Sequence, residues 1–374
     1  MQNSDKQNDI SSSRIFALDV FRGITIAGMI CVNNPGSEFV YTPFAHSQWN
    51  GLTPTDLVFP FFMFIMGVSM YLSLSKSQFT CTRSILAKIL KRSLLIWIIG
   101  LGLNAFMLFC QKGFLNSDIR ILGILPRLAI CYGTASLIAI TVKYKHIVYI
   151  ISTLLVGYLL LLLLGNGFDY NESNILSFVD RHILGLNHMY SDNGIDPEGI
   201  LSTIPSIAHT LIGFCCGKII KDRNDIHIKI ERLFLVGAVL IFLGYFLSFG
   251  CPINKKIWSP TYVFATCGLA ALLLALLIWL IDVKKYKQWT GFFHVFGMNP
   301  LFLYVLSEAL AVGLYAVGFH DNGSWISAHK ALYNIIHVKS LSPYGASLLF
   351  AFILVGFNWF VGYILYKKKI FIKI

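Results

Sequence analysis

The sequence predicts an all-α integral membrane protein, a polytopic bundle of about ten transmembrane helices. Its 374 residues are 56% hydrophobic and only 13% charged, and the mean hydropathy is +0.68, a combination outside the range of soluble globular domains. Apolar segments of about 20 residues recur along the whole chain, each long enough to cross a bilayer. Their uninterrupted runs of Leu, Ile, Phe and Val lack the alternation of a membrane β-barrel.

The expected spans cover most of the chain and leave room for one domain. They are residues 15–33, 57–75, 90–109, 121–142, 147–164, 200–220, 233–250, 259–281, 295–318 and 346–366. No linker or internal repeat interrupts them. We therefore expect a single transmembrane domain at 15–366, with a short polar N-terminus at 1–14 and a basic tail at 367–374. The first apolar run is long enough to stay in the bilayer as an anchor.

The net charge of +12 indicates topology. Most Lys and Arg residues fall between spans on the side that holds the N-terminus, as in residues 83–92, 218–232 and 284–287. By the positive-inside rule both termini are cytoplasmic, and the loop after the first span, which carries no Lys or Arg, faces outward. Because the basic residues form no soluble basic face, we expect no nucleic-acid partner.

The eight cysteines fall mostly within predicted helices. Their spacing does not match a metal site, and the adjacent pair Cys215-Cys216 has no His companion. We expect free thiols and no bound metal.

Groups able to do chemistry concentrate in the first external loop. His46 is the central candidate, because an imidazole can act as a general base or as a nucleophile toward an activated acyl group. Asn33 and Asn50 offer amide donors of the kind that stabilise an oxyanion, and Asp56 could orient His46. The structural alternatives are a His bonded to its own loop, turn-forming asparagines, and Asp56 as a helix cap.

Further charges lie near the predicted helix ends. Arg14 and Arg22 stand where an anionic phosphate would arrive from the cytoplasm, although Arg22 could instead pair with Asp19 three residues before it. An ion pair between Arg127 and Glu308 is one arrangement that would bury both charges.

The remaining charged candidates are expected to contact an acceptor substrate. The acids among them could receive an ammonium group, and the alternative for Asp196-Pro197-Glu198 is an ordinary helix start. The substrate-binding candidates are Arg120, Arg127, Asp196, Glu198 and Glu308.

Taken in order, these motifs resemble the transmembrane acyltransferases related to heparan-alpha-glucosaminide N-acetyltransferase. The resemblance covers nearly the whole chain. It rests on Leu18-Asp19-Val20-Phe21-Arg22-Gly23, Val32-Asn33, His46-Ser47-Gln48-Trp49-Asn50-Gly51, Asp56-Leu57-Val58-Phe59-Pro60, Arg120-Ile121-Leu122-Gly123, Pro126-Arg127-Leu128, Asp196-Pro197-Glu198-Gly199, Ile253-Asn254-Lys255, Trp258-Ser259, Gly297-Met298-Asn299 and Lys368-Lys369-Ile370-Phe371.

The resemblance implies an enzyme that moves an acetyl group from cytoplasmic acetyl-CoA to the amine of a glucosamine-type sugar on the external face. It implies His46 as the catalytic residue and Asn33 as its associate. From the positions of the charges, we expect the nucleotide of acetyl-CoA to bind near Arg14 and Arg22. We expect a bacterial-type protein of the inner (plasma) membrane, without the N-terminal luminal domain of the animal enzymes. The expected partners are an amino-sugar or glycan acceptor and the lipid bilayer, and a homodimer is left open.

Two other functions fit parts of the sequence. An O-acyltransferase of the same superfamily would modify glycan hydroxyls, and a secondary transporter would also have many helices with buried charges. Within the first reading, His46 serves either as a base or as an acetyl carrier, and the residues do not separate the two.

Overall fold

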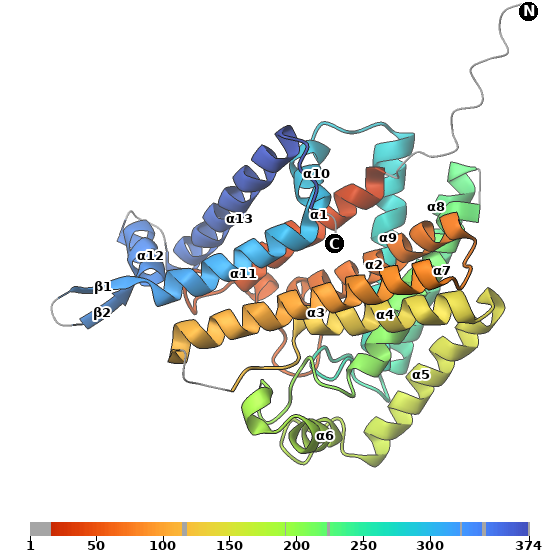
Figure 1. Cartoon of the computed structure of the whole chain (residues 1–374), viewed down its shortest axis with the longest axis horizontal. Coiled ribbons are helices and arrows are strands. Elements are labelled where there is room, and N and C mark those ends of the chain that lie inside the picture. Colours follow the sequence, from red (N-terminus) through yellow and green to blue (C-terminus); the bar gives the residue numbers. More distant parts are fainter. Residues whose placement is uncertain are drawn as a thin grey trace, which may run out of the picture.

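The computed structural model describes residues 16–113, 118–190, 192–222, 225–321, 324–338 and 342–372, and the chain folds there almost entirely into helices (Figure 1). The predicted all-α, polytopic membrane architecture is confirmed. The helices are α1 (Phe16–Asn33), α2 (Val58–Leu74), α3 (Arg83–Lys112), α4 (Ile124–Thr141), α5 (Tyr144–Leu164), α6 (Ile175–Ile183), α7 (Thr203–Asp222), α8 (Ile226–Leu247), α9 (Pro260–Ile278), α10 (Thr290–Met298), α11 (Pro300–Ala316), α12 (Ala328–Val338) and α13 (Pro343–Lys367).

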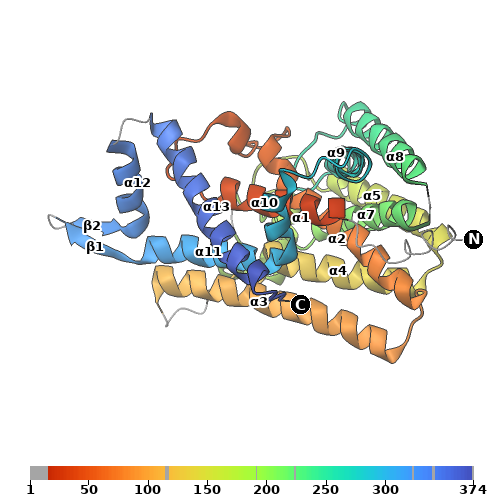
Figure 2. The ribbon, with the colours of Figure 1, turned by 90° about the horizontal axis from the view of Figure 1, so that it is seen from above.

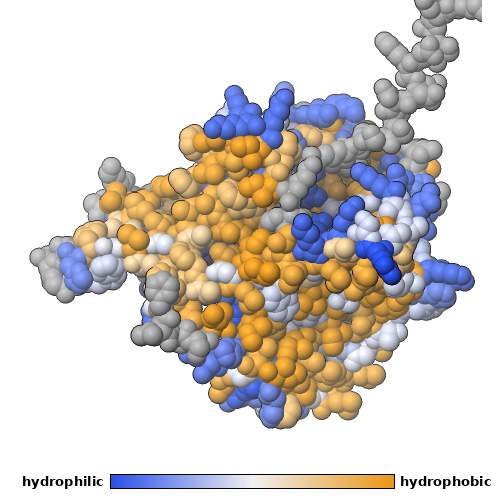
Figure 3. Space-filling model, viewed as in Figure 1, coloured by the Kyte–Doolittle hydropathy of each residue, from blue (hydrophilic) through white to orange (hydrophobic). Residues whose placement is uncertain are grey.

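Within the described residues, 9 helices are long and apolar enough to cross a membrane, and the bent pair α10–α11 makes 10 if it is counted as one span. Burial separates inner from outer helices: 72% of the most apolar stretch of α7 is buried inside the protein, against 11% of that of α3. The outer helices turn large apolar side chains outward, as lipid contact requires. Figure 3 shows one face covered largely by hydrophobic side chains, with hydrophilic ones mostly toward its margins.

The expected span 295–318 is not one straight helix. It is divided between α10 and α11, which meet at an angle of 86°. Asn299 has φ −130° and ψ 53°, outside the helical region, and Pro300 follows it. A proline cannot donate to the preceding turn and disfavours a helical residue before it, so the break lies where the sequence places Asn-Pro. Asn299 bridges this break to the C-terminal segment, donating to the Ile370 carbonyl and accepting from the Ile372 amide.

Both ends of the described chain pack against α10. The His294 ring of α10 lies 4.8 Å from the ring of Phe16 and 5.6 Å from that of Tyr366. Close packing of α1 on α10 supports this: a Cβ atom on Gly23 would lie 1.7 Å from the Phe293 carbonyl oxygen, so only glycine fits there.

Two structured segments outside the spans were not predicted. Strands β1 (Gly318–Asp321) and β2 (Ser324–Ser327) pair antiparallel, and with α12 they project from one end of the bundle (Figures 1 and 2). The long segment between α5 and α7 contains the short helix α6. These pieces are too short or too polar to show in a search for membrane spans.

Candidate active site

The loop between α1 and α2 is organised around the carboxylate of Asp56. Residues Pro54–Leu57 form a 3₁₀ turn that leads into α2. Asp56 Oδ2 accepts hydrogen bonds from the backbone amides of Ser47 and Thr53, both at 3.1 Å, and from the Thr53 hydroxyl at 2.9 Å. The Asp56 side chain is fully buried. Its second oxygen is left for a titratable partner.

That partner is His46. Its Nδ1 lies 2.7 Å from Asp56 Oδ1. A carboxylate oxygen and an unprotonated nitrogen would repel at this distance, so Nδ1 carries the proton and donates it to Asp56. The lone pair is then on Nε2. Because half of the His46 side chain is exposed, this nitrogen belongs to a group that a substrate can reach.

The turn between α8 and α9 packs onto this loop. The Gly51 amide donates to the Ile253 carbonyl at 2.8 Å, and Asn254 Nδ2 donates to Asn50 Oδ1 at 3.0 Å. Asn254 also anchors its own turn, because its Oδ1 accepts from the Ile257 amide. Asn50 therefore joins the two segments, and its side-chain oxygen is engaged in that contact.

The same turn brings Lys255 to the candidate base. Its Nζ lies 3.0 Å from His46 Nδ1 and 3.4 Å from Asp56 Oδ1, and 18% of its side chain is exposed. Burial lowers the pKa of Lys255, and the charges of Asp56 and Glu198 oppose that shift. His46, Asp56 and Lys255 form what we call the histidine cluster.

A second group of charges lies between the segment before α4 and the segment before α7. Arg120 Nη2 contacts Asp196 Oδ1 at 2.5 Å and Glu198 Oε2 at 2.7 Å. Asp196 is completely buried and also accepts from the backbone amides of Tyr190 and Glu198. We call Arg120, Asp196 and Glu198 the arginine cluster. It connects two segments far apart in the sequence.

Burial and pairing act in opposite directions on these acids. Burial raises the pKa of Asp196, and the charge of Arg120 opposes that shift. Burial also opposes ionisation of Glu198, but Arg120 and Arg127 together lower its pKa. The charge of Glu198 stabilises the ammonium of Lys255, so the two clusters interact electrostatically.

Asn33, the last residue of α1, contacts Glu308 of α11, a pairing that the sequence did not predict. Asn33 Nδ2 donates to Glu308 Oε1 at 3.1 Å, which connects α1 to α11. The pairing of Glu308 with Arg127 considered from the sequence is wrong. Arg127 is fully buried and instead donates to Ser202 and to the Gly199 carbonyl, with its guanidinium over the Trp258 ring. His46 and Asn33 make no hydrogen bond to each other.

Arg22 is the candidate cofactor residue that the structure describes, and it contacts α1 and α2 side chains. Arg22 donates to Asp19 at 3.2 Å and to the Ser69 hydroxyl of α2 at 2.8 Å, so the pairing with Asp19 considered from the sequence is confirmed. Arg14 lies outside the described residues. Within the part of the chain that the structure describes, no group of three or more His, Cys, Asp or Glu side chains is placed to hold a metal.

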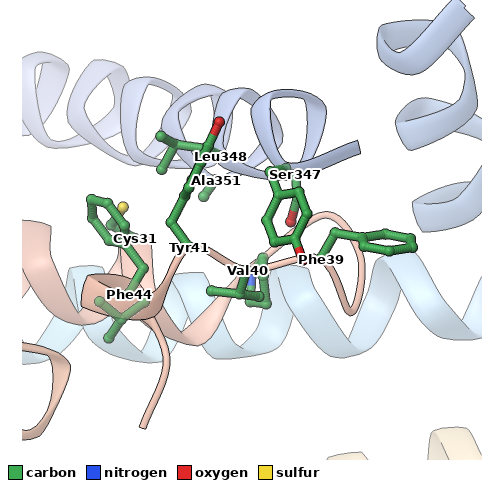
Figure 4. Close-up of a pocket in the computed structure, with 11 residues that line it drawn as sticks. Cys31, Phe39, Val40, Tyr41, Phe44, Ser347, Leu348 and Ala351 are labelled. Atoms are coloured by element: carbon green, nitrogen blue, oxygen red, sulfur yellow. The ribbon is translucent and has the colours of Figure 1, made fainter. Parts of the chain in front are cut away.

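An apolar hollow opens beside the loop between α1 and α2. It lies between the end of α1, residues 35–44 and α13. In Figure 4 the rings of Phe39, Tyr41 and Phe44 and the side chains of Cys31 and Leu348 surround it. Its lining is mainly apolar and contains no charged side chain.

The contact of Lys255 with His46 was not predicted. Lys255 belongs to the Ile253-Asn254-Lys255 motif, but that turn and His46 are about two hundred residues apart in the sequence. The signal that could have found it is a lysine on the side that the charge pattern predicts to face outward, which has few basic residues.

The fold and site define a polytopic membrane protein with a buried carboxylate behind an accessible imidazole. The family model described as "Heparan-alpha-glucosaminide N-acetyltransferase, catalytic" matches residues 14–249, more than half of the chain. The chain belongs to this family. It is 29% identical to heparan-alpha-glucosaminide N-acetyltransferase of Mus musculus and 31% identical to that of Homo sapiens, over 97% and 96% of its length.

The alignments cover 61% of the mouse protein and 60% of the human one. The chain thus spans about three fifths of the length of these relatives. The region matched by the family model contains Asn33, His46 and Asp56 and the whole arginine cluster, whereas Lys255 and Glu308 lie beyond it.

Proposed function

We propose that this protein is a transmembrane N-acetyltransferase. It takes an acetyl group from cytoplasmic acetyl-CoA and transfers it to the amine of a glucosamine-type sugar on the external face of a bacterial inner membrane. The observation that carries the proposal is the contact of His46 Nδ1 with the buried carboxylate of Asp56, which leaves Nε2 as a lone-pair nitrogen in an accessible position. Membership of the family supports the reaction class.

The chemistry follows from that nitrogen. As a base, Nε2 removes a proton from the acceptor amine while the amine attacks the thioester carbonyl, and the CoA thiolate leaves. As a carrier, Nε2 attacks the thioester itself, CoA leaves, and the acetylimidazole passes its acetyl group to the amine. In either route the proton on Nδ1 continues to be donated to Asp56, so the carboxylate stabilises the positively charged imidazole that forms.

Asn33 is the proposed donor to the oxyanion. One of its amide protons is given to Glu308, which fixes the orientation of the group and leaves the second proton for the carbonyl oxygen. Glu308 is therefore proposed to contribute through Asn33.

The proposed substrates arrive from opposite sides. Arg22, together with Arg14, is proposed to meet the phosphates of acetyl-CoA at the end of the bundle where α1 begins. On the external side the arginine cluster frames the acceptor site, and Glu198, whose side chain is 16% exposed, is its more accessible carboxylate. Asn50 and Arg127 hold the surrounding segments in place.

The direct test uses purified protein, labelled acetyl-CoA and free glucosamine. We expect labelled N-acetylglucosamine, identified by mass spectrometry, and an O-acetyl product would assign the protein to the O-acyltransferases. Rapid quench with labelled acetyl-CoA alone separates the two routes: label on the His46 peptide indicates the carrier, and its absence in an active preparation indicates the base.

A secondary transporter is the second candidate. The observation that favours it is the break between α10 and α11, because transporters often bind substrates at discontinuous helices. Calorimetry with CoA discriminates: a transporter of an unrelated solute shows no CoA affinity, whereas the acetyltransferase binds CoA and loses its activity when His46 is replaced.

A further inference from the structure

Lys255 lies beside the candidate base and its carboxylate partner. Its Nζ is 3.0 Å from His46 Nδ1 and 3.4 Å from Asp56 Oδ1. The charged groups that face it are Asp56 from the start of α2, Glu198 from the segment before α7, and Lys256 from its own turn. His46 itself is the titratable group on the remaining side.

The shortest distance in the histidine cluster is the basis for assigning the proton at Nδ1. The 2.7 Å contact with Asp56 requires the proton on Nδ1. Lys255 therefore does not donate to that nitrogen, and its ammonium protons are directed toward the carboxylate of Asp56. A cation thus lies next to an imidazole that already carries one proton. A second proton on the ring would place two positive charges side by side.

We propose that Lys255 is a positioning residue that compensates the charge of Asp56 and so keeps His46 in its neutral form with the lone pair on Nε2. The inference rests on the proposed function for its catalytic meaning, because a base or a nucleophile must be unprotonated when the substrates bind. Asp56 orients the ring, and Lys255 prevents the same carboxylate from holding His46 as a stable imidazolium.

The neighbouring lysine shows what a structural role looks like. Lys256 contacts Asp192 at 2.6 Å and the Tyr170 hydroxyl at 2.8 Å, with its Nζ over the Tyr170 ring. It makes no contact with His46 or with Asp56. Two adjacent lysines in one turn thus have different surroundings, which makes Lys256 the matched control for Lys255.

Removal of the Lys255 charge has a defined consequence. In Lys255→Met the buried carboxylate of Asp56 has His46 as its remaining cationic partner, so the imidazolium is favoured. The neutral imidazole then requires a more alkaline solution. We expect the pH at which half of the His46 rings are neutral to rise by about 1 to 2 units.

The test measures the ring directly and needs no substrate. Diethyl pyrocarbonate reacts with the unprotonated imidazole, and the rate of modification of the His46 peptide is followed by mass spectrometry from pH 5 to 9 in the purified full-length protein. The variants are Lys255→Met, Lys255→Gln, which keeps a hydrogen-bond donor without the charge, Lys255→Arg, which keeps the charge, and Lys256→Met. Acetyl transfer is measured on the same preparations across the same pH range.

We expect the midpoint of modification to rise in Lys255→Met and Lys255→Gln and to stay within about half a unit of the wild type in Lys255→Arg and Lys256→Met. The activity profile should move with it. Equal midpoints in the wild type and in a folded Lys255→Gln protein overturn the inference. If the midpoint rises in the Lys255 variants but the wild-type protein transfers no acetyl group, the charge relation is supported and the proposed function is contradicted. The two failures are therefore distinguishable.

Discussion

The histidine cluster and the arginine cluster contain similar side chains, but they leave different atoms available. In the arginine cluster, Arg120 meets both acids, and the oxygens of Asp196 are taken up by Arg120 and two backbone amides. In the histidine cluster the same kind of buried carboxylate ends at an imidazole whose side chain is 50% exposed. The difference teaches that charge near a membrane marks chemistry only where a titratable group is oriented by buried partners and is still accessible.

The largest effect is expected when the charge of Asp56 is removed from the histidine cluster. Asp56→Asn keeps the shape of the side chain but removes the charge that stabilises a positive imidazole. The amide of the variant neither fixes the tautomer of His46 nor balances the positive charge of its ring. We therefore expect the rate of acetyl transfer to fall by about a thousandfold, roughly 4 kcal/mol. Steady-state kinetics check this, and an Asp56→Asn protein with wild-type kcat would place catalysis elsewhere.

Removing the cation of the arginine cluster should lower the stability of the protein. Arg120→Met leaves Asp196 buried beside Glu198 without their cation, and we expect a loss of about 3 to 5 kcal/mol in detergent unfolding. Arg181→Met is the control, because its partner Glu172 is 70% exposed and such surface pairs contribute at most about 1 kcal/mol. Equal losses in the two variants would show that Arg120 is no more than a surface contact.

The proposed oxyanion role of Asn33 is tested by comparing two variants, one expected to have a large effect and one a small effect. Asn33→Ala removes the proposed donor, and we expect kcat to fall about a hundredfold, near 3 kcal/mol. Glu308→Gln keeps an oxygen that accepts from Asn33, so its effect should stay below about tenfold. If Glu308→Gln were the more damaging change, Glu308 and not Asn33 would be the group that acts on the substrate.

A pH-dependent effect is expected next to the arginine cluster. Burial raises the pKa of Asp180 to about 6, and its Oδ1 accepts from the Ile200 amide. A raised carboxyl pKa adds stability that is complete below the unfolded pKa near 4 and is lost as the pH rises through about 6. Asp180→Asn removes the ionisation.

The variant should therefore be more stable than the wild type above pH 6, by up to about 3 kcal/mol, and equal to it at pH 4. Thermal unfolding in detergent at the two pH values measures the difference. A constant difference at both values would contradict the assignment to Asp180 ionisation.

The sequence was sufficient for the helical class and for most spans, because a bilayer imposes a length and composition that a single segment shows by itself. Its reading of 295–318 as one helix failed at Asn299-Pro300, where a local backbone rule overrides apolar composition. His46 and Asp56 are ten residues apart in one loop, so their contact could be predicted from the sequence. Lys255 and the contact of Asn33 with Glu308 depend on how distant segments pack, which no local pattern contains.

The most direct test of the central claim compares two histidines. His46→Ala and His182→Ala are purified and assayed for acetyl transfer from acetyl-CoA to glucosamine, with His182 chosen because it is exposed and bonds only the carbonyl of its own helix. We predict that His182→Ala stays within about twofold of the wild type and that His46→Ala loses at least about a thousandfold. A folded His46→Ala protein with activity within about tenfold of the wild type would contradict the account.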